Sequence, residues 1–214
     1  MNESIKNRRP GRPRIDAAQH AAMRDRIADV AGRLFRSEGY GSISMRRVAK
    51  ELSINPMTLY RYYPTKLAML SRIWNAIFED VFNRIDVESR TVANPRQRLT
   101  ILSSLYVSYW LEHRENYHLV FMSSGLSRTD VETFVAEEAA ASKFQVFFQC
   151  LAEIWETGET DGATKQRADQ LICGLHGIMH CIITMPGYPW TNTATLVDGM
   201  VLAALHDKAS DTRL

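Results

Sequence analysis

Residues 52–66, LSINPMTLYRYYPTK, gather side chains that can hold an anion or a polar partner. Three tyrosines, one arginine and one lysine lie in this stretch, which also contains two prolines. Tyrosine joins a rigid apolar ring to a hydroxyl that donates and accepts hydrogen bonds, and arginine and lysine are positively charged donors. A buried core would account for one or two of these rings. We therefore expect the others to face a partner outside the fold.

The elements that position this stretch are predicted to be helices. From about Asp16, apolar residues recur at helical spacing as far as Gly39, which suits the residue after a helix end. Ser44 can cap a second helix that ends near Ser53. Asn55 can cap a third, with proline at its first position, that runs about seven residues to Tyr62. With only two residues free between them, the second and third helices predict a helix-turn-helix.

The third helix has two faces. Leu59 and Tyr63 are four residues apart and should face inward, which leaves the remaining side chains to point outward: Thr58, Tyr60, Arg61 and Tyr62. Hydroxyls, a guanidinium and rigid rings suit the major groove of DNA, where they can bond phosphates and touch base edges. Lys66 and the backbone amides at the start of the next helix offer a second phosphate anchor. If the tyrosines instead served only to pack the helices, the basic residues beside them would be unexplained.

The segment SMRRVAKELSINPMTLYRYYPTKLAML, preceded by FRSEGYGSISM, resembles the TetR family of bacterial transcriptional regulators over about residues 20–75. The resemblance implies phosphate contacts from four residues: Ser44, Thr58, Tyr60 and Lys66. It implies positions at or near base edges for six: Arg46, Asn55, Pro56, Met57, Arg61 and Tyr62. Position 57 departs from the family, which often has glycine or alanine there, so the base specificity cannot be transferred.

The N-terminal arm, residues 1–15, is basic and poor in apolar residues, so we expect it to be disordered alone. Its RRPGRPR run is similar to the core of an AT-hook, in which arginines lie along a narrow minor groove; the candidates are Arg9, Arg12 and Arg14. A plain basic tail is the other interpretation. Residues 1–63 carry 13 Lys plus Arg against 6 Asp plus Glu, a net of +7, whereas the rest carries 13 against 18, a net of −5. A basic head on an acidic body indicates that a polyanionic partner binds at the head end of the molecule only.

The remaining chain predicts an all-α protein of about nine helices, with a DNA-binding domain at 16–66 and a helical body at 67–214. After the fourth helix, which joins head to body, helices are expected at about 96–112, 114–123, 128–157, 164–185 and 192–208. The last two are apolar nearly all round and resemble the family's dimerisation helices. A homodimer would bury them and place two recognition helices about 34 Å apart on a two-fold operator.

The body also holds many large adaptable side chains, which can build either a core or an apolar cavity. We expect them to line a pocket for an apolar or aromatic small molecule, and the candidates are Trp110, His113, Tyr117, Phe121, Phe144, Phe147, Cys150, Leu151, His176, Met179 and His180. For any single one of these residues, a core role is the stronger interpretation. An acidic body disfavours an anionic ligand.

The sequence contains no recognisable motif for a metal site or for enzymatic catalysis. His176 and His180 have a spacing that can chelate zinc, but no glutamate adjoins the first, so we expect no metal and no cofactor. No phosphate loop, nucleophile elbow or CxxC occurs, and no apolar run would span a membrane. We expect a cytoplasmic, ligand-responsive repressor that is not an enzyme. An architectural DNA-binding protein without ligand control and a metal-dependent enzyme with a DNA-binding head are the alternatives.

Overall fold

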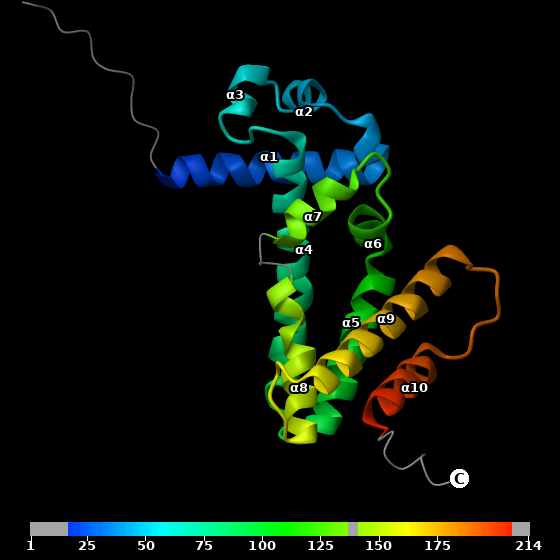
Figure 1. The fold of residues 1–214 in the computed structure, drawn as a ribbon. Coiled ribbons are helices and arrows are strands. Elements are labelled where there is room, and N and C mark those ends of the chain that lie inside the picture. The colour runs from blue at the N-terminus through cyan, green and yellow to red at the C-terminus, as the bar shows by residue number, and fades with distance from the viewer. Residues whose placement is uncertain (1–16, 137–140, 207–214) are drawn as a thin grey trace, which may run out of the picture.

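The computed structural model describes residues 17–136 and 141–206, and these form ten α-helices and two short 3-10 turns without a strand. The long helix α4 (Lys66–Ser89) is the axis of the molecule. Helix α1 (Ala17–Glu38) crosses one end of it, with α2 (Met45–Glu51) and α3 (Pro56–Tyr60) on the far side of α1 (Figure 1). The all-α prediction is confirmed. We call α1–α3 the head and α5–α10 the body.

Helices α2, α3 and α4 each begin where the sequence signal for a helix start lies. The Ser44 side chain accepts a hydrogen bond from the Arg47 amide at 3.2 Å and starts α2. Asn55 Oδ1 accepts from the Met57 amide at 2.8 Å and starts α3. Thr65 Oγ1 accepts from the Ala68 amide at 3.0 Å and starts α4. Such caps stabilise a helix by about 1 kcal/mol each. Helix α3 is shorter than expected, because regular helix ends at Tyr60 and turns follow.

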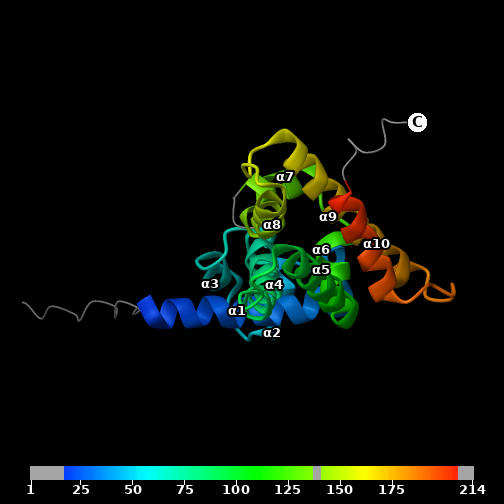
Figure 2. The same ribbon diagram turned by 90° about the horizontal axis from the view of Figure 1, so that it is seen from below.

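The body wraps the other end of α4. Its helices are α5 (Pro95–Glu112), α6 (Arg114–Phe121), α7 (Arg128–Ala136), α8 (Gln145–Trp155), α9 (Gly162–Thr184) and α10 (Thr193–Leu205). Helix α5 packs against α4, α8, α9 and α10, and α9 and α10 lie together on one flank (Figure 2). Buried side chains of head and body form one continuous core.

One expected helix is wrong: residues 128–157 do not form a single helix. The structure has α7, the 3-10 turn Ala141–Phe144 and α8 in its place. Phe134 and Phe144 both contact the Phe78 ring of α4, with centroids 6.3 and 6.1 Å away. A straight helix would hold these two residues about 15 Å apart along its axis, so the chain has to bend for both to reach one ring.

Candidate functional site

Helix α3 has the two faces that its sequence predicted. Leu59 and Tyr63 are completely buried, and the Tyr63 hydroxyl donates to the backbone carbonyl of Arg24 in α1 at 3.1 Å. Burial raises the pKa of Tyr63, so this hydroxyl keeps its proton. On the opposite face Met57 is 72% exposed and Tyr60 is 45% exposed. A short helix therefore presents an apolar thioether and a phenol to solvent from a rigid base.

The other predicted DNA-contacting residues have more varied surroundings. Arg46 and Arg61 are exposed, and Thr58 and Pro56 are half-buried. Tyr62 is half-buried too, because its ring packs on the His20 ring of α1 with centroids 4.7 Å apart. Ser44 and Asn55 use one oxygen each as a helix cap. The Ser44 hydroxyl and the Asn55 amide still carry hydrogens that can be donated to a phosphate or a base.

Lys66 has an internal role that its sequence position does not reveal. Its Nζ donates to the carbonyl oxygens of Tyr40 at 2.8 Å and Ile43 at 3.0 Å, and lies 3.8 Å from the centre of the Tyr40 ring. Partial burial lowers the pKa of the ammonium group. An ammonium has three N–H donors, so one remains for a phosphate.

Sequence reasoning missed Arg47, which links α2 to the end of α1. Its guanidinium pairs with Glu51 at 2.7 Å and with Glu38, at the end of α1, at 2.9 Å. The i, i+4 spacing of Arg47 and Glu51 was the available signal. The arm residues Arg9, Arg12 and Arg14 lie outside the described residues, so the two interpretations of the arm stay predictions.

In the body, many of the predicted pocket residues form one aromatic cluster around α5. We define this aromatic cluster by its rings: Phe78, Phe82, Tyr106, Trp110, Phe121, Phe134, Phe144, Phe147 and His176. Trp110 and Phe147 are completely buried, whereas Phe121 is 38% exposed at the edge. Phe121 contacts Trp110 and His176 with centroids 5.0 and 4.8 Å apart.

A hydrogen bond lies inside this cluster. The Tyr106 hydroxyl and His176 Nε2 are 2.9 Å apart, and Tyr106 is completely buried. Burial raises the pKa of Tyr106 and lowers that of His176 to about 4, so both side chains are neutral at pH 7. The body thus offers one uncharged polar pair within apolar walls.

The remaining predicted pocket residues are not all brought together. Cys150 Sγ lies 3.0 Å from the carbonyl oxygen of Pro95, at the start of α5, while Trp110 is near the end of that helix, about 22 Å along its axis. Leu151 and Met179 are buried in α8 and α9. Tyr117 of α6 is buried and does contact the aromatic cluster, with its ring centroid 6.1 Å from that of Trp110 and 5.0 Å from that of Phe121. Its hydroxyl lies 3.5 Å from Nδ1 of the exposed His180.

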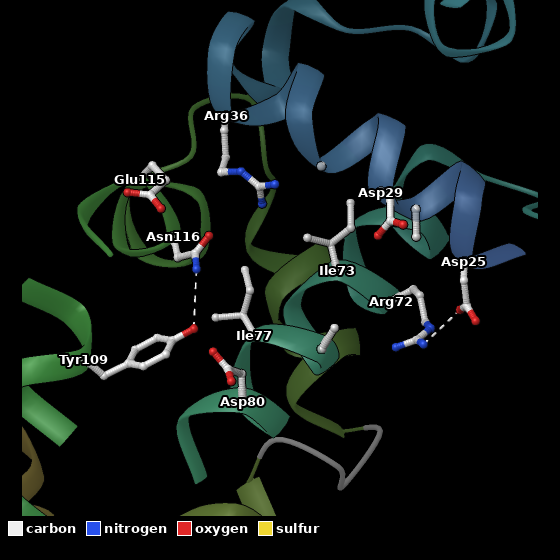
Figure 3. A pocket seen from close by; sticks show the side chains of 13 residues that line it. Asp25, Asp29, Arg36, Arg72, Ile73, Ile77, Asp80, Tyr109, Glu115 and Asn116 are labelled. Atoms are coloured by element: carbon white, nitrogen blue, oxygen red, sulfur yellow. Dashed lines mark hydrogen bonds and ion pairs between the residues drawn. The ribbon is translucent and has the colours of Figure 1, made fainter. Parts of the chain in front are cut away.

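His113 lies beside Tyr109, a residue that lines a groove that the sequence did not predict. Its ring contacts Tyr109, with centroids 4.5 Å apart. The groove has a volume of about 420 Å³, and none of the predicted pocket residues lines it. Its walls come from α1, α4, α5 and α6 (Figure 3): Asp25, Asp29, Arg36, Arg72, Ile73, Ile77, Asp80, Tyr109, Glu115 and Asn116.

Charges of both signs line this groove. Arg72 pairs with Asp25 at 3.0 Å, and the Asn116 amide donates to the Tyr109 hydroxyl at 3.4 Å (Figure 3). Burial, with Asp80 nearby, raises the pKa of Tyr109 to about 12. The groove is therefore polar and lies between head and body. Three distant parts of the sequence build it, namely α1, α4 and the consecutive helices α5 and α6, so no local pattern indicates it.

Two further properties concern the described residues as a whole. No helix among them is long and apolar enough to cross a membrane. In the same part of the chain, His, Cys, Asp and Glu side chains do not form a group of three or more that could hold a metal ion.

Comparisons with known proteins agree with this architecture. The family model described as bacterial regulatory proteins, tetR family, matches residues 27–73, and the tetracyclin repressor-like C-terminal domain matches residues 99–202. The uncharacterised HTH-type transcriptional regulator YuxN of Bacillus subtilis is 26% identical over 129 residues, which are 60% of this chain. The matched part spans only 44% of YuxN.

Solved structures share the whole fold. The transcriptional regulator FadR of Bacillus subtilis, in complex with stearoyl-CoA, has a TM-score of 0.66 at 13% identity, covering 86% of this chain and 97% of that one. A transcriptional regulator of Saccharomonospora viridis, in complex with choline, has a TM-score of 0.62 at 20% identity, covering 87% and 97%. The two family models together cover most of the head and most of the body, and the chain belongs to the TetR family of DNA-binding transcriptional regulators.

Proposed function

We propose that this chain represses transcription as a homodimer that binds two-fold operator DNA and is released by an apolar small molecule. The observation that carries the DNA-binding part is the two-faced helix α3. The completely buried side chains of Leu59 and Tyr63 anchor this helix, while Met57, Tyr60 and Arg61 face solvent. An anchored helix with free side chains can enter a major groove without rearrangement.

Phosphate and base contacts divide among these side chains by chemistry. The Tyr60 hydroxyl can donate to a phosphate, and the Arg61 guanidinium can bond guanine O6 and N7 in the major groove. The Met57 thioether is apolar and suits the thymine methyl group. We assign phosphate contacts also to Ser44, through its free hydroxyl hydrogen.

The surface of α9 and α10 supports the homodimer. Leu202 is 67% exposed on α10. Gly177 on α9 and Gly199 on α10 are exposed, and a Cβ added to either would meet no other part of the chain within 4 Å. An exposed leucine beside glycines lets helices of a second copy approach closely. A two-fold pair would present two α3 helices to successive turns of the groove, about 34 Å apart.

The aromatic cluster supports the choice of ligand class. Its walls are rings, its polar pair of Tyr106 and His176 is neutral at pH 7, and Phe121 reaches the surface at its edge. An apolar molecule that displaces Phe121 would meet aromatic faces and one hydrogen-bonding pair. The relatives bound to stearoyl-CoA and choline differ in ligand chemistry from each other, so the rings of this chain decide the class.

The DNA-binding experiment begins with selection of genomic fragments by the purified protein. On the selected operator, Arg61→Ala should lose about 5- to 150-fold in affinity, since a base contact is worth about 1–3 kcal/mol, and it should lose much less on random DNA. Tyr60→Phe should weaken both by similar factors. Arg96→Ala, an exposed arginine at the start of α5, removes the same charge far from α3 and is the control. Equal losses for Arg61→Ala and Arg96→Ala would contradict the assignment.

The ligand experiment is a thermal-shift screen of apolar aromatic compounds, with stearoyl-CoA and choline as added probes. A compound that prefers the DNA-free form by about 100-fold, or about 2.7 kcal/mol, should weaken operator binding by the same factor, because coupling is reciprocal. If no compound stabilises the protein or releases DNA, ligand control is refuted and the architectural alternative is favoured.

A further inference from the structure

The groove of Figure 3 has the size of a small-molecule site, and the function proposed above does not use it. Its volume of about 420 Å³ lies within the roughly 300–1,000 Å³ that such sites occupy. Along α4, the side chains of Ile73, Ala76 and Ile77 line it with apolar atoms, and α1, α5 and α6 supply the remaining walls. A bound molecule would therefore contact several helices at once.

The side chains that line the groove carry an excess of negative charge. Four carboxylates and two guanidinium groups belong to the lining, a net of −2. They are Asp25, Asp29, Asp80 and Glu115, with Arg36 and Arg72. The pair of Arg72 and Asp25, at 3.0 Å, cancels one charge of each sign. A concave lining with one sign of charge in excess attracts ligands of the opposite sign, so this groove favours a cation.

The other charged side chains of the groove are not fully paired. Arg36 lies on the side of Glu115 (Figure 3), and Arg84, which is outside the groove, pairs with Asp80 at 3.5 Å. Asp29 forms no ion pair within the part of the chain that the structure describes. Two exposed carboxylates, Asp29 and Asp80, can therefore accept hydrogen bonds from a bound cation.

These two carboxylates lie at different places along the groove. A Cβ added to Gly32 of α1 would lie 3.7 Å from Ile73 Cγ2, so α1 crosses α4 at Ile73. Asp29 lies within one turn of Gly32, whereas Asp80 lies about 10 Å beyond Ile73 along α4. Among the described residues, carboxylates do not gather in a group of three or more that could hold a metal ion. Separated charges suit an organic cation with more than one ammonium group.

A buried hydroxyl lies at the Asp80 end of the groove. Tyr109 is only 4% exposed, and its hydroxyl points into the groove (Figure 3). The hydrogen bond that it accepts from the Asn116 amide is long, at 3.4 Å, compared with about 2.9 Å for a typical N–H···O bond. The phenol oxygen has a second lone pair that can accept from an ammonium group. Together with the nearby Asp80 carboxylate, this hydroxyl forms a site for one ammonium.

We propose that the groove binds a linear aliphatic polyamine. One ammonium group lies between Asp80 and Tyr109, a second lies at Asp29, and the methylene chain between them covers Ile73 and Ile77. The chain removes apolar surface from water, while the ammonium groups replace water with carboxylate and hydroxyl acceptors. This binding requires neither operator DNA nor a ligand in the aromatic cluster, so it can fail while the proposed function holds.

The test is isothermal titration calorimetry of the full chain with spermidine. DNA is left out, because polyamines also bind its phosphates, and salt at about 0.15 M screens attraction to distant surface carboxylates. Spermidine should bind at one site per chain. Putrescine, whose two ammonium groups are too close together to reach both Asp29 and Asp80, should bind about fivefold more weakly or less. Absence of spermidine binding, or equal affinity for the two amines, would overturn the inference.

Single substitutions locate the site. Asp29→Asn and Asp80→Asn should each weaken spermidine binding about fivefold, the effect of one ion pair lost at an exposed position. Tyr109→Phe removes only the buried hydroxyl and should weaken it by a similar factor. Glu79→Gln is the control, because it removes a charge from an exposed position of α4 that does not line the groove. Equal losses for Asp80→Asn and Glu79→Gln would mean general attraction to an acidic surface and would overturn the inference.

A second pair of variants fills the groove. Ala76 is exposed on α4 and lines the groove between Ile73 and Asp80, so Ala76→Lys places a tethered ammonium group and its aliphatic stem where the polyamine would lie. This variant should lose spermidine binding. Val87→Lys adds the same charge at a 72% exposed position of α4 outside the groove and should keep it. Binding that persists in Ala76→Lys, or that both variants lose equally while remaining folded, would contradict a site in the groove.

Discussion

His176 should make the body less stable in mild acid. Its ring is mostly buried among aromatic side chains. Its hydrogen-bond partner, the Tyr106 hydroxyl, is neutral and does not carry a negative charge that would stabilise a protonated imidazole. Burial lowers its pKa to about 4 in the folded chain, whereas an unfolded histidine titrates near 6.5. The unfolded state therefore binds a proton that the folded state rejects.

The sign and the size follow from this difference. The free energy of unfolding falls as the pH drops from about 6.5 towards 4, and it is unaffected by His176 well above 6.5. Between pH 7 and pH 5 the loss is about 2 kcal/mol, and at most about 3 kcal/mol when the pH reaches the folded pKa.

The assay is urea unfolding at pH 7 and pH 5, at one protein concentration because a dimer's stability depends on it. His176→Gln can still bond Tyr106 but does not titrate, so its loss between the two pH values should be about 2 kcal/mol smaller than that of the unsubstituted protein. His118→Gln replaces an exposed histidine of α6 and should leave the full loss in place. The reasoning is refuted if His176→Gln and the unsubstituted protein lose equal stability.

Three further predictions test other parts of the molecule. Deleting residues 1–15 should flatten the salt dependence of DNA binding by about 0.9 log unit for each phosphate that the arm neutralises, and an unchanged slope would make the arm a spectator. Leu202→Glu should shift the protein to monomer in analytical ultracentrifugation, whereas Val87→Glu, at an equally exposed site on α4, should not. In the Leu202→Glu background, where the protein should be monomeric, Gly177→Ala should add about 0.5–1 kcal/mol to helix stability, because there its Cβ meets nothing within 4 Å. Gly174→Ala should show no such gain in thermal unfolding, because its Cβ would lie 3.1 Å from Met200 Cγ and closer still to the Met200 sulfur. Similar gains for Gly177→Ala and Gly174→Ala would contradict the packing of α9 on α10.

The head was largely predictable because its signals are local. Ser44 and Asn55 begin α2 and α3 through bonds to amides two or three residues away, so residue types at short spacing were sufficient. The inward positions of Leu59 and Tyr63 followed from the helical period in the same way. Local hydrogen bonding and periodicity thus determined the helices, the helix-turn-helix and the face of α3 that remains exposed.

Only the tertiary structure decided which distant residues meet. The bend between α7 and α8 arises because Phe134 and Phe144 share one ring of α4, although the sequence between them is helix-forming. Cys150 lies by Pro95 and not by Trp110 because α8 packs along the length of α5. The groove likewise joins segments that are far apart in the chain. Close packing of whole helices decides such contacts, and no residue's spacing from its own neighbours encodes them.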